Sequence, residues 1–325
     1  MAGYQSIYEY EKQDKEKFWL QAAKLIDWIV EPKRALDNST GLANQWFSDG
    51  QMNSCFNAVD RHVLSGHGEQ IAIQYESPIT GASSSLSFAE LQKMTAKFAG
   101  MLMQQGLTKG DRVIIYMPMI KEAVISMLGC ARIGVVHSVV FGGFAAAELA
   151  KRIDDCQPKL IVSASCGHEP SRIVYYKPLL DQAIEQANHK PQTCVIYQRD
   201  AVTAKMIEGR DIEWHEAIEP ALPAEPVAVM ANDPLYILYT SGTTGVPKGI
   251  VRDIGGHIVA LKWTMKNIYD INEDDVWWSA SDIGWIVGHS YIVYAPLFKG
   301  CTTVLFEGKP VGTPDAGAFW KIISE

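Results

Sequence analysis

The sequence lacks a long uninterrupted apolar run, a cysteine pair and an excess of positive charge. Its most apolar stretch, residues 123–144, contains Arg132, His137 and four glycines, so no membrane span is predicted. The six cysteines form no C-x-x-C pair, which argues against a disulfide scaffold or a zinc cluster and favours a reducing compartment. With 29 lysines and arginines against 37 aspartates and glutamates, the formal net charge is -8. No overall positive field therefore attracts nucleic acid or an anionic membrane.

Targeting signals and two common catalytic motifs are missing as well. Residues 1–21 are charged and polar, without the apolar core of a secretory signal or the Arg-rich, acid-poor composition of a transit peptide, so a cytoplasmic location is predicted. The eight histidines show no H-E-x-x-H or similar spacing, and no G-x-S-x-G occurs. We therefore expect neither a metal held by protein ligands nor a serine hydrolase.

Length and composition predict about two domains with a sizeable core, since the chain has 325 residues and a hydrophobic content of 47%. Residues 7–29 carry apolar side chains at a helical period, which predicts a helix. Residues 32–57 are rich in aromatics but show no sustained period. We expect residues 1–60 to form an irregular, α-rich N-terminal extension wrapped on a larger body, residues 61–325.

The larger body alternates between strand and helix patterns. Strands are predicted at 70–75, 111–117, 135–141 and 159–164, and helices at 87–105, 120–133, 145–155 and 177–188. Ser87 and Glu90 form a capping box at the start of the first of these helices, and Gly106 is its stop signal. Short β-branched runs separated by amphipathic helices predict an α/β fold of mostly parallel sheet layers flanked by helices.

A loop rich in glycine and hydroxyl side chains follows a further strand at 235–239. The segment YTSGTTGVPKG, residues 239–249, precedes a helix predicted at 256–266, so the expected order is strand, loop, helix. Converging backbone N–H groups, four hydroxyls and Lys248 would suit a polyphosphate. The spacing is neither a Walker loop nor G-x-G-x-x-G. Composition alone fits a flexible turn equally well, and a lysine after a proline is most often a solvated surface residue.

The order of residues in this loop resembles the signature loop of adenylate-forming enzymes, the superfamily of acyl-CoA synthetases, luciferases and peptide-synthetase adenylation domains. WFSDGQMNSCFNAVDRH at 46–62, VVFGGFAAAELAKRI at 139–153 and SDIGWIVGHSYIVYAPL at 281–297 are similar to short-chain acyl-CoA synthetases. Within that group SGTTGVPKGIVRD and SASCG resemble propionyl-CoA synthetases more than acetyl-CoA synthetases. The resemblance runs from Tyr4 to the last residue and implies the N-terminal part of the adenylate-forming large domain.

This resemblance implies ATP-dependent activation of a short-chain carboxylate, with propionate favoured over acetate. The carboxylate would attack the α-phosphorus of ATP to give acyl-AMP and pyrophosphate, and coenzyme A would then displace AMP. ATP, Mg²⁺ and coenzyme A are the implied cofactors, and small molecules the implied partners. The residues that the resemblance assigns to the ATP phosphates are Thr240, Ser241, Gly242, Thr243, Thr244, Gly245 and Lys248.

The acyl and coenzyme A sites are implied in the same way. Trp285, Ile286 and Val287 match the family's acyl pocket, although Trp285 alone would pass for an ordinary core aromatic. Where acetyl relatives carry a threonine that faces coenzyme A this chain has Val287, and where they carry a second arginine it has Glu169, so a weaker anion site is expected. The residues implied in coenzyme A binding are Phe141, Gly142, Gly143, Glu169, Pro170, Ser171, Arg172 and Val287.

Other residues near these stretches have plainer interpretations. Arg172 without the family would be a routine surface charge, His289 is more easily a satisfied core histidine, and helix capping explains Asp282 as well as a site role does. Family members continue beyond position 325 to a small C-terminal domain with the catalytic lysine, so no catalytic residue is expected here and the chain is expected to be an N-terminal portion. Two alternatives remain: a fragment that binds nucleotide phosphates or coenzyme A without turnover, and an inert fragment that associates through uncovered apolar faces. The sequence carries no signal of an oligomeric state.

Overall fold

Two sheets with helices between and around them form the protein. The computed structural model describes residues 3–39, 44–240, 247–309 and 312–324. Within these residues the larger sheet has seven strands, in the order β12 (Asp211–Glu213), β11 (Thr193–Tyr197), β8 (Leu160–Ala164), β6 (Arg112–Tyr116), β7 (Val136–Val139), β14 (Pro234–Thr240) and β15 (Lys248–Asp253). Every neighbouring pair is parallel except β14 with β15.

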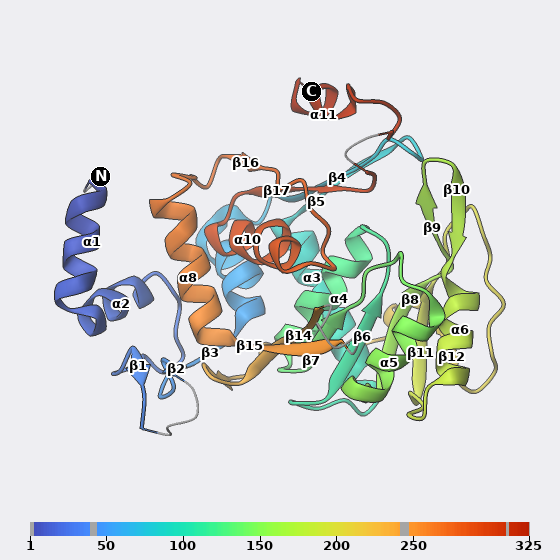
Figure 1. Cartoon of the computed structure of the whole chain (residues 1–325), viewed down its shortest axis with the longest axis horizontal. Coiled ribbons are helices and arrows are strands. Elements are labelled where there is room, and N and C mark those ends of the chain that lie inside the picture. The colour runs from blue at the N-terminus through green and yellow to red at the C-terminus, as the bar shows by residue number, and fades with distance from the viewer. Residues whose placement is uncertain (1–2, 40–43, 241–246, 310–311, 325) are drawn as a thin grey trace.

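The second sheet lies on the other side of two long helices. Its strands are β16 (Val276–Trp277), β17 (Thr302–Phe306), β4 (Ile71–Ser77) and β5 (Ala82–Ser87), and only β4 with β5 is antiparallel. The helices α3 (Phe88–Gln104) and α4 (Lys121–Arg132) run between the two sheets, while α5 (Ala146–Cys156) and α6 (Tyr176–Gln186) cover the far face of the larger sheet (Figure 1). The predicted α/β class, with mostly parallel sheet layers flanked by helices, is confirmed.

The predicted boundaries of α3 are also found. The Ser87 hydroxyl accepts a hydrogen bond from the Glu90 N–H, and the Glu90 carboxylate accepts one from the Ser87 N–H. At the other end Gly106 has a φ of 76° and the Leu107 N–H donates to the Leu102 carbonyl, the six-to-one hydrogen bond that ends a helix at a left-handed glycine.

The remaining helices and short strands connect these layers. The helices are α7 (Trp214–Ile218), α8 (Ile254–Asn267), α9 (Ile286–Gly288), α10 (Ala295–Lys299), α11 (Ala318–Ser324) and the π-helical η1 (Phe56–Asp60), η2 (Val63–His67) and η3 (His289–Tyr294). The short strands pair as hairpins or ribbons: β1 (Leu36–Asp37) with β2 (Gln45–Trp46), β3 (Gln51–Met52) with β13 (Val229–Met230), and β9 (Cys166–Glu169) with β10 (Arg172–Tyr175). No helix among the described residues is long and apolar enough to span a membrane.

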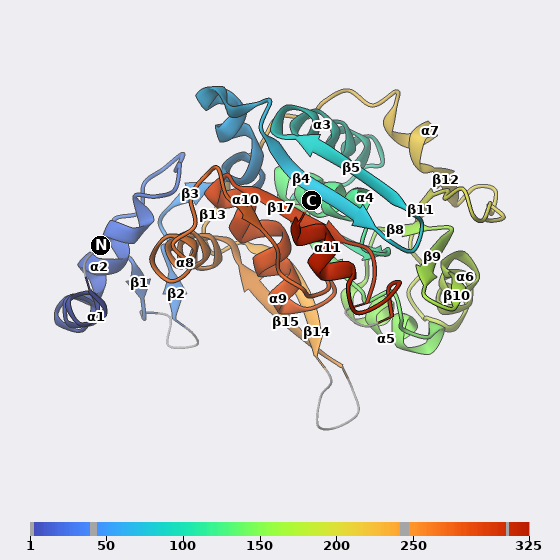
Figure 2. The same cartoon turned by 90° about the horizontal axis from the view of Figure 1, so that it is seen from above.

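The N-terminal segment differs from the single helix predicted at 7–29. Two helices occur, α1 (Tyr4–Gln13) and α2 (Lys15–Ala23), because Asp14 leaves helical geometry and its carboxylate caps α2 by accepting the Lys17 N–H. Phe18 and Trp19 of α2 then pack on Trp263 of α8, with ring centroids 5.9 and 6.0 Å apart. Figure 2 shows α1 and α2 at the opposite end of the molecule from the β9–β10 hairpin.

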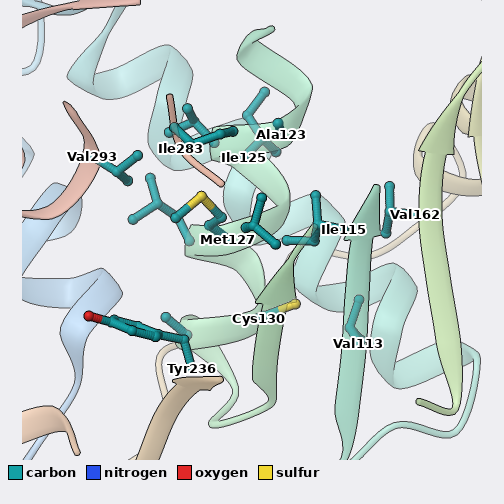
Figure 3. Close-up of a cluster of buried hydrophobic side chains, with 14 of the residues drawn as sticks. Val113, Ile115, Ala123, Ile125, Met127, Cys130, Val162, Tyr236, Ile283 and Val293 are labelled. Carbon is teal, nitrogen blue, oxygen red and sulfur yellow. The ribbon is translucent and has the colours of Figure 1, made fainter. Parts of the chain in front are cut away.

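One continuous core joins the larger sheet to the segment that follows β16. Figure 3 shows Met127 of α4 between Ile115 of β6 on one side and Ile283 and Val293 on the other, and these last two come from more than 150 residues further along the chain. Ile283 is buried, and its N–H lies 3.2 Å from the Met119 sulfur. The core therefore fixes the SDIGW stretch through Ile283 and the segment after it through Val293.

Candidate functional site

The predicted phosphate loop joins two strands rather than a strand and a helix. β14 ends at Thr240 and β15 begins at Lys248, and these two residues face each other as a register pair. The segment 248–253 was missed as a strand because KGIVRD has only two apolar residues and continues the polar loop. Thr240 and Lys248 are exposed at the open end of this hairpin. The remaining predicted phosphate contacts, Ser241, Gly242, Thr243, Thr244 and Gly245, lie outside the described residues.

Helix α5 holds the end of β14 beside this loop. The Tyr239 hydroxyl donates to the Asp155 carboxylate at 2.6 Å, and the Arg152 guanidinium lies over the Tyr239 ring, 5.5 Å from its centroid. The loop therefore starts from a strand whose last aromatic side chain is anchored.

A cavity of about 360 Å³ lies where three strands end. It opens beyond the C-terminal ends of β6 and β7 in the larger sheet and of β17 in the smaller one, the edge at which ligands bind in parallel sheets. Its volume is within the range of small-molecule sites. The lining residues come from five separate segments: Met117, Pro118 and Met119; Phe141, Gly142 and Gly143; His168, Glu169 and Tyr176; Trp278, Ala280, Ser281, Asp282 and Trp285; and Phe306, Glu307, Gly308, Lys309 and Phe319.

One side of this cavity is aromatic. The Trp285 ring lies 6.0 Å from that of Phe141, and Trp278 packs between Phe306 and Phe319 at 5.5 and 4.6 Å. The structure thus places Trp285 in the cavity wall, beside the predicted FGGF turn. Ile286 and Val287 begin α9, are about half exposed and do not line this cavity.

The carboxyl group of Asp282 also lies in this cavity wall, in an apolar setting. Burial raises its pKa to about 6, and the Gly284 N–H, 2.7 Å from its carboxylate, partly offsets that shift. It does not cap α9, because the residue before that helix is Trp285. Asp282 therefore changes charge close to neutral pH inside the cavity.

The FGGF turn and the β9–β10 hairpin enclose a second cavity of about 380 Å³. Gly142, Gly143 and Glu169 line both cavities, whereas Arg172 lines only this one. A side chain could not replace hydrogen at Gly142, because a Cβ there would lie 1.9 Å from the Tyr176 hydroxyl oxygen. Of the residues predicted to bind coenzyme A, Gly142, Gly143, Glu169 and Arg172 line this cavity although about 30 positions separate the two pairs. Phe141 lines only the first cavity, and Pro170, Ser171 and Val287 line neither.

Glu169 and Arg172 face each other across a two-residue turn made by Pro170 and Ser171. Arg172 Nε donates to Glu169 Oε2 at 2.9 Å, and Lys309 Nζ lies 3.3 Å from Glu169 Oε1. The hydrogen bond from Arg172 is the largest of the effects that lower the pKa of the Glu169 carboxyl; burial opposes it, and Lys309 adds to the lowering. The hairpin was missed in the sequence because CGHEPSRIVY is short and mostly polar.

Lys309 is held by a buried network that sequence reasoning also missed. Its neighbour Glu307 accepts two hydrogen bonds from Arg199, at 2.6 and 2.8 Å, and one from the Tyr75 hydroxyl at 2.6 Å. The Lys309 N–H itself donates to the buried Thr313 hydroxyl at 2.9 Å. No local signal marks Lys309, because its partner Glu169 lies 140 positions earlier.

A buried cluster of histidines and tyrosines lies behind Trp285. His289 is fully buried with its Nδ1 3.4 Å from the Trp285 carbonyl, and its ring stacks on His137 with centroids 5.8 Å apart. Burial lowers the pKa of His289 to about 4 and that of His257 to about 3, so both rings are neutral at pH 7. Among the residues that the structure describes, no group of three or more His, Cys, Asp or Glu side chains is placed to hold a metal ion.

The larger sheet is mostly parallel, its strands end at a lined cavity, and β14 leads into a segment rich in glycine and hydroxyl side chains. Residues 60–325 match the family described as AMP-binding enzyme, and residues 4–58 match the acetyl-coenzyme A synthetase N-terminus. The chain belongs to the AMP-binding enzyme family, as the resemblance of its loop had indicated.

The curated relatives it matches are about twice as long. The chain is 50% identical over 313 residues to the mitochondrial acyl-CoA synthetase short-chain family member 3 of Rattus norvegicus, covering 96% of this chain and 46% of the relative. The human protein of the same name is 49% identical over 313 residues, with the same coverage. The acetyl-coenzyme A synthetase of Streptomyces avermitilis is 43% identical over 320 residues, covering 98% of this chain and 49% of the relative.

Proposed function

We propose that this protein takes part in the ATP-dependent activation of a short-chain carboxylate and its transfer to coenzyme A, with propionate preferred over acetate. The observation that carries the proposal is the 360 Å³ cavity, because its wall joins Trp285 to the FGGF turn and to Glu169 of the β9–β10 hairpin. The relatives named as short-chain acyl-CoA and acetyl-coenzyme A synthetases support the same reaction class.

In this proposal the two steps use neighbouring surfaces. The loop from Thr240 to Lys248 binds the phosphates of ATP and the departing pyrophosphate, so its role is charge stabilisation and positioning rather than covalent chemistry. Mg²⁺ enters with ATP and lowers the charge of the phosphate oxygens. Coenzyme A binds along the second cavity, past Gly142 and Gly143 towards Arg172. Its thiol attacks the acyl carbon of the acyl-AMP, and the bond from that carbon to AMP breaks, so AMP leaves as the thioester forms.

The preference for propionate rests on the apolar wall. Trp285 and Phe141 offer a flat surface for a short alkyl chain, whereas Ile286 and Val287, which the resemblance assigned to the acyl pocket, lie outside this cavity. An apolar pocket discriminates one methylene by about 1 to 3 kcal/mol, which corresponds to roughly tenfold to two-hundredfold in rate. We further propose that residues 1–60 form an extension to an adenylation unit that begins at residue 61. The cytoplasmic location remains a prediction from the N-terminal sequence.

The test is propionate-dependent exchange of labelled pyrophosphate into ATP by this chain. We expect exchange that is faster with propionate than with acetate, and a loss of about a hundredfold in Lys248→Ala, since one preorganised donor contributes about 3 kcal/mol. Lys93→Ala, on the exposed surface of α3, is the matched control and should exchange at the normal rate.

Calorimetry with coenzyme A separates turnover from binding. Coenzyme A binding together with background exchange in every variant would favour the alternative of binding without turnover and refute adenylation by this chain. Absence of both signals would refute the proposed function as a whole. Arg172→Ala is the binding control and should weaken the affinity for coenzyme A.

A further inference from the structure

The rim between the two cavities carries one carboxylate and two cations from distant parts of the chain. Glu169 lines both cavities, Arg172 lines the second, and Lys309 lines the first. The carboxylate divides its two oxygens between the cations, with Oε2 on Arg172 and Oε1 on Lys309. The three groups together have a net charge of about +1.

The positions of the two cations are set independently of each other. Arg172 is placed by the β-hairpin, where it is the register partner of Glu169. Lys309 is placed from the other sheet. Glu307, the residue after β17, pairs with Arg199, and the Lys309 N–H donates a hydrogen bond to the Thr313 hydroxyl. Glu169 is the group that both cations contact, so moving its carboxylate would leave two positive charges facing one space.

We propose that Arg172 and Lys309 together bind a phosphomonoester group of the thiol co-substrate, and that Glu169 competes with that phosphate for the two cations. The inference rests on the proposed function, and it adds Lys309 as a binding residue and Glu169 as a negative determinant of affinity. A phosphomonoester carries about -1.5 to -2 charges and three acceptor oxygens at pH 7, so it outcompetes a single carboxylate for a guanidinium and an ammonium.

Geometry and exposure favour an exchangeable pair over a purely structural one. The Arg172 and Lys309 side chains are 69% and 54% exposed, so a ligand can reach both, whereas Glu307 and Arg199 next to them are buried and fixed. An exposed ion pair contributes little to stability, so its opening costs little. The carboxylate can therefore turn away when a phosphate enters.

The experiment compares coenzyme A with dephospho-coenzyme A, which lacks the 3′-phosphomonoester, by calorimetry on this chain and its variants. Lys309→Met should weaken the affinity for coenzyme A about fivefold to tenfold and change the affinity for dephospho-coenzyme A less than twofold. Lys309→Arg should restore the affinity for coenzyme A. Glu169→Gln should tighten coenzyme A about threefold. Lys109→Met is the control, because Lys109 is 47% exposed and also paired with an aspartate.

The outcomes separate this inference from the proposed function. The assignment of Lys309 is wrong, while the proposed function stands, if the unmodified chain and Lys309→Met bind coenzyme A equally well. It is also wrong if Lys309→Met weakens the affinities for coenzyme A and dephospho-coenzyme A to the same extent. If Glu169→Gln weakens coenzyme A, Glu169 is not a competitor. If the unmodified chain binds neither thiol, the proposed function fails and this inference fails with it.

Discussion

Replacing Arg132 with methionine should lower the free energy of unfolding by about 3 to 5 kcal/mol, because it would leave the Asp60 carboxylate buried without a cation. Arg132 donates to both Asp60 oxygens, at 2.7 and 2.9 Å, and the two side chains are only 3% and 5% exposed. Its Nε also donates to the Ala224 carbonyl at 2.6 Å. The pair joins η1 near the N-terminal segment to the end of α4.

The magnitude follows from what remains after the substitution. Gln92 still donates to Asp60 at 2.8 Å, which partly compensates the stranded carboxylate, while the Ala224 carbonyl loses its donor at a cost of about 1 to 3 kcal/mol. Unfolding entropy of about 2.1 cal/mol/K per residue then converts 3 to 5 kcal/mol into a fall in melting temperature of about 4 to 7 °C. Urea unfolding followed by circular dichroism and tryptophan fluorescence measures the same loss directly.

Two further variants make this reasoning testable. Lys151→Met removes an exposed pair with Glu148 and should cost less than about 1 kcal/mol. Arg132→Met combined with Asp60→Leu should recover most of the lost stability, because a buried ion pair exchanged for apolar groups is often nearly neutral. The argument is refuted if Arg132→Met costs no more than Lys151→Met, or if the double variant is as unstable as the single one.

Two other perturbations have clear expected results. Gly100→Ala should destabilise the protein by about 1 to 3 kcal/mol despite the better helix propensity of alanine, because its Cβ would lie 1.8 Å from the Leu222 carbonyl oxygen. Gly68→Ala is the control, since its Cβ would have its nearest neighbour at 3.5 Å. Equal urea midpoints for the two variants would contradict the packing argument. Acidification from pH 7.5 to 5.5 should lower the free energy of unfolding. Burial lowers the folded-state pKa values of His62, His137, His257 and His289, whereas in the unfolded chain these side chains become charged near pH 6.5. The unfolded state therefore binds more protons as the pH falls. Asp282, with its pKa raised to about 6, and Lys262, with its pKa lowered by burial to about 7, oppose this by up to one proton each. A urea midpoint that rises on acidification would show that the histidines are not neutral in the fold.

The alternating βα units could be predicted because each buries a periodic apolar face that the local sequence records. The capping box at Ser87 and the stop at Gly106 are local signals of the same kind, complete within a few residues. The break at Asp14 was overlooked, although an aspartate followed by a helix turn is a capping signal too. Strand β5, with three consecutive serines, and strand β15 owe their extended form to a paired neighbour instead of to their own composition.

The candidate site divides along the same line. The sequence motifs predicted the loop, the FGGF turn and Trp285 as site elements, because each motif is a continuous run of residues. Lys309, which completes the rim, and the buried pair Glu307 and Arg199 beside it come from segments with no motif, and only the packing of the two sheets brings Lys309 to Glu169. Side-chain pairs that span sheets leave no trace in local sequence.

The position of Lys248 at the start of a strand has an electrostatic consequence for any anion in the loop. Because β15 spans six residues before α8 begins, about 20 Å of extended chain separates Lys248 from the first turn of that helix. The partial positive charge of a helix N-terminus fades within its first turn, so α8 contributes almost nothing to a bound phosphate. Attraction must then come from the lysine ammonium and nearby N–H groups, and binding of ATP should weaken steeply with added salt.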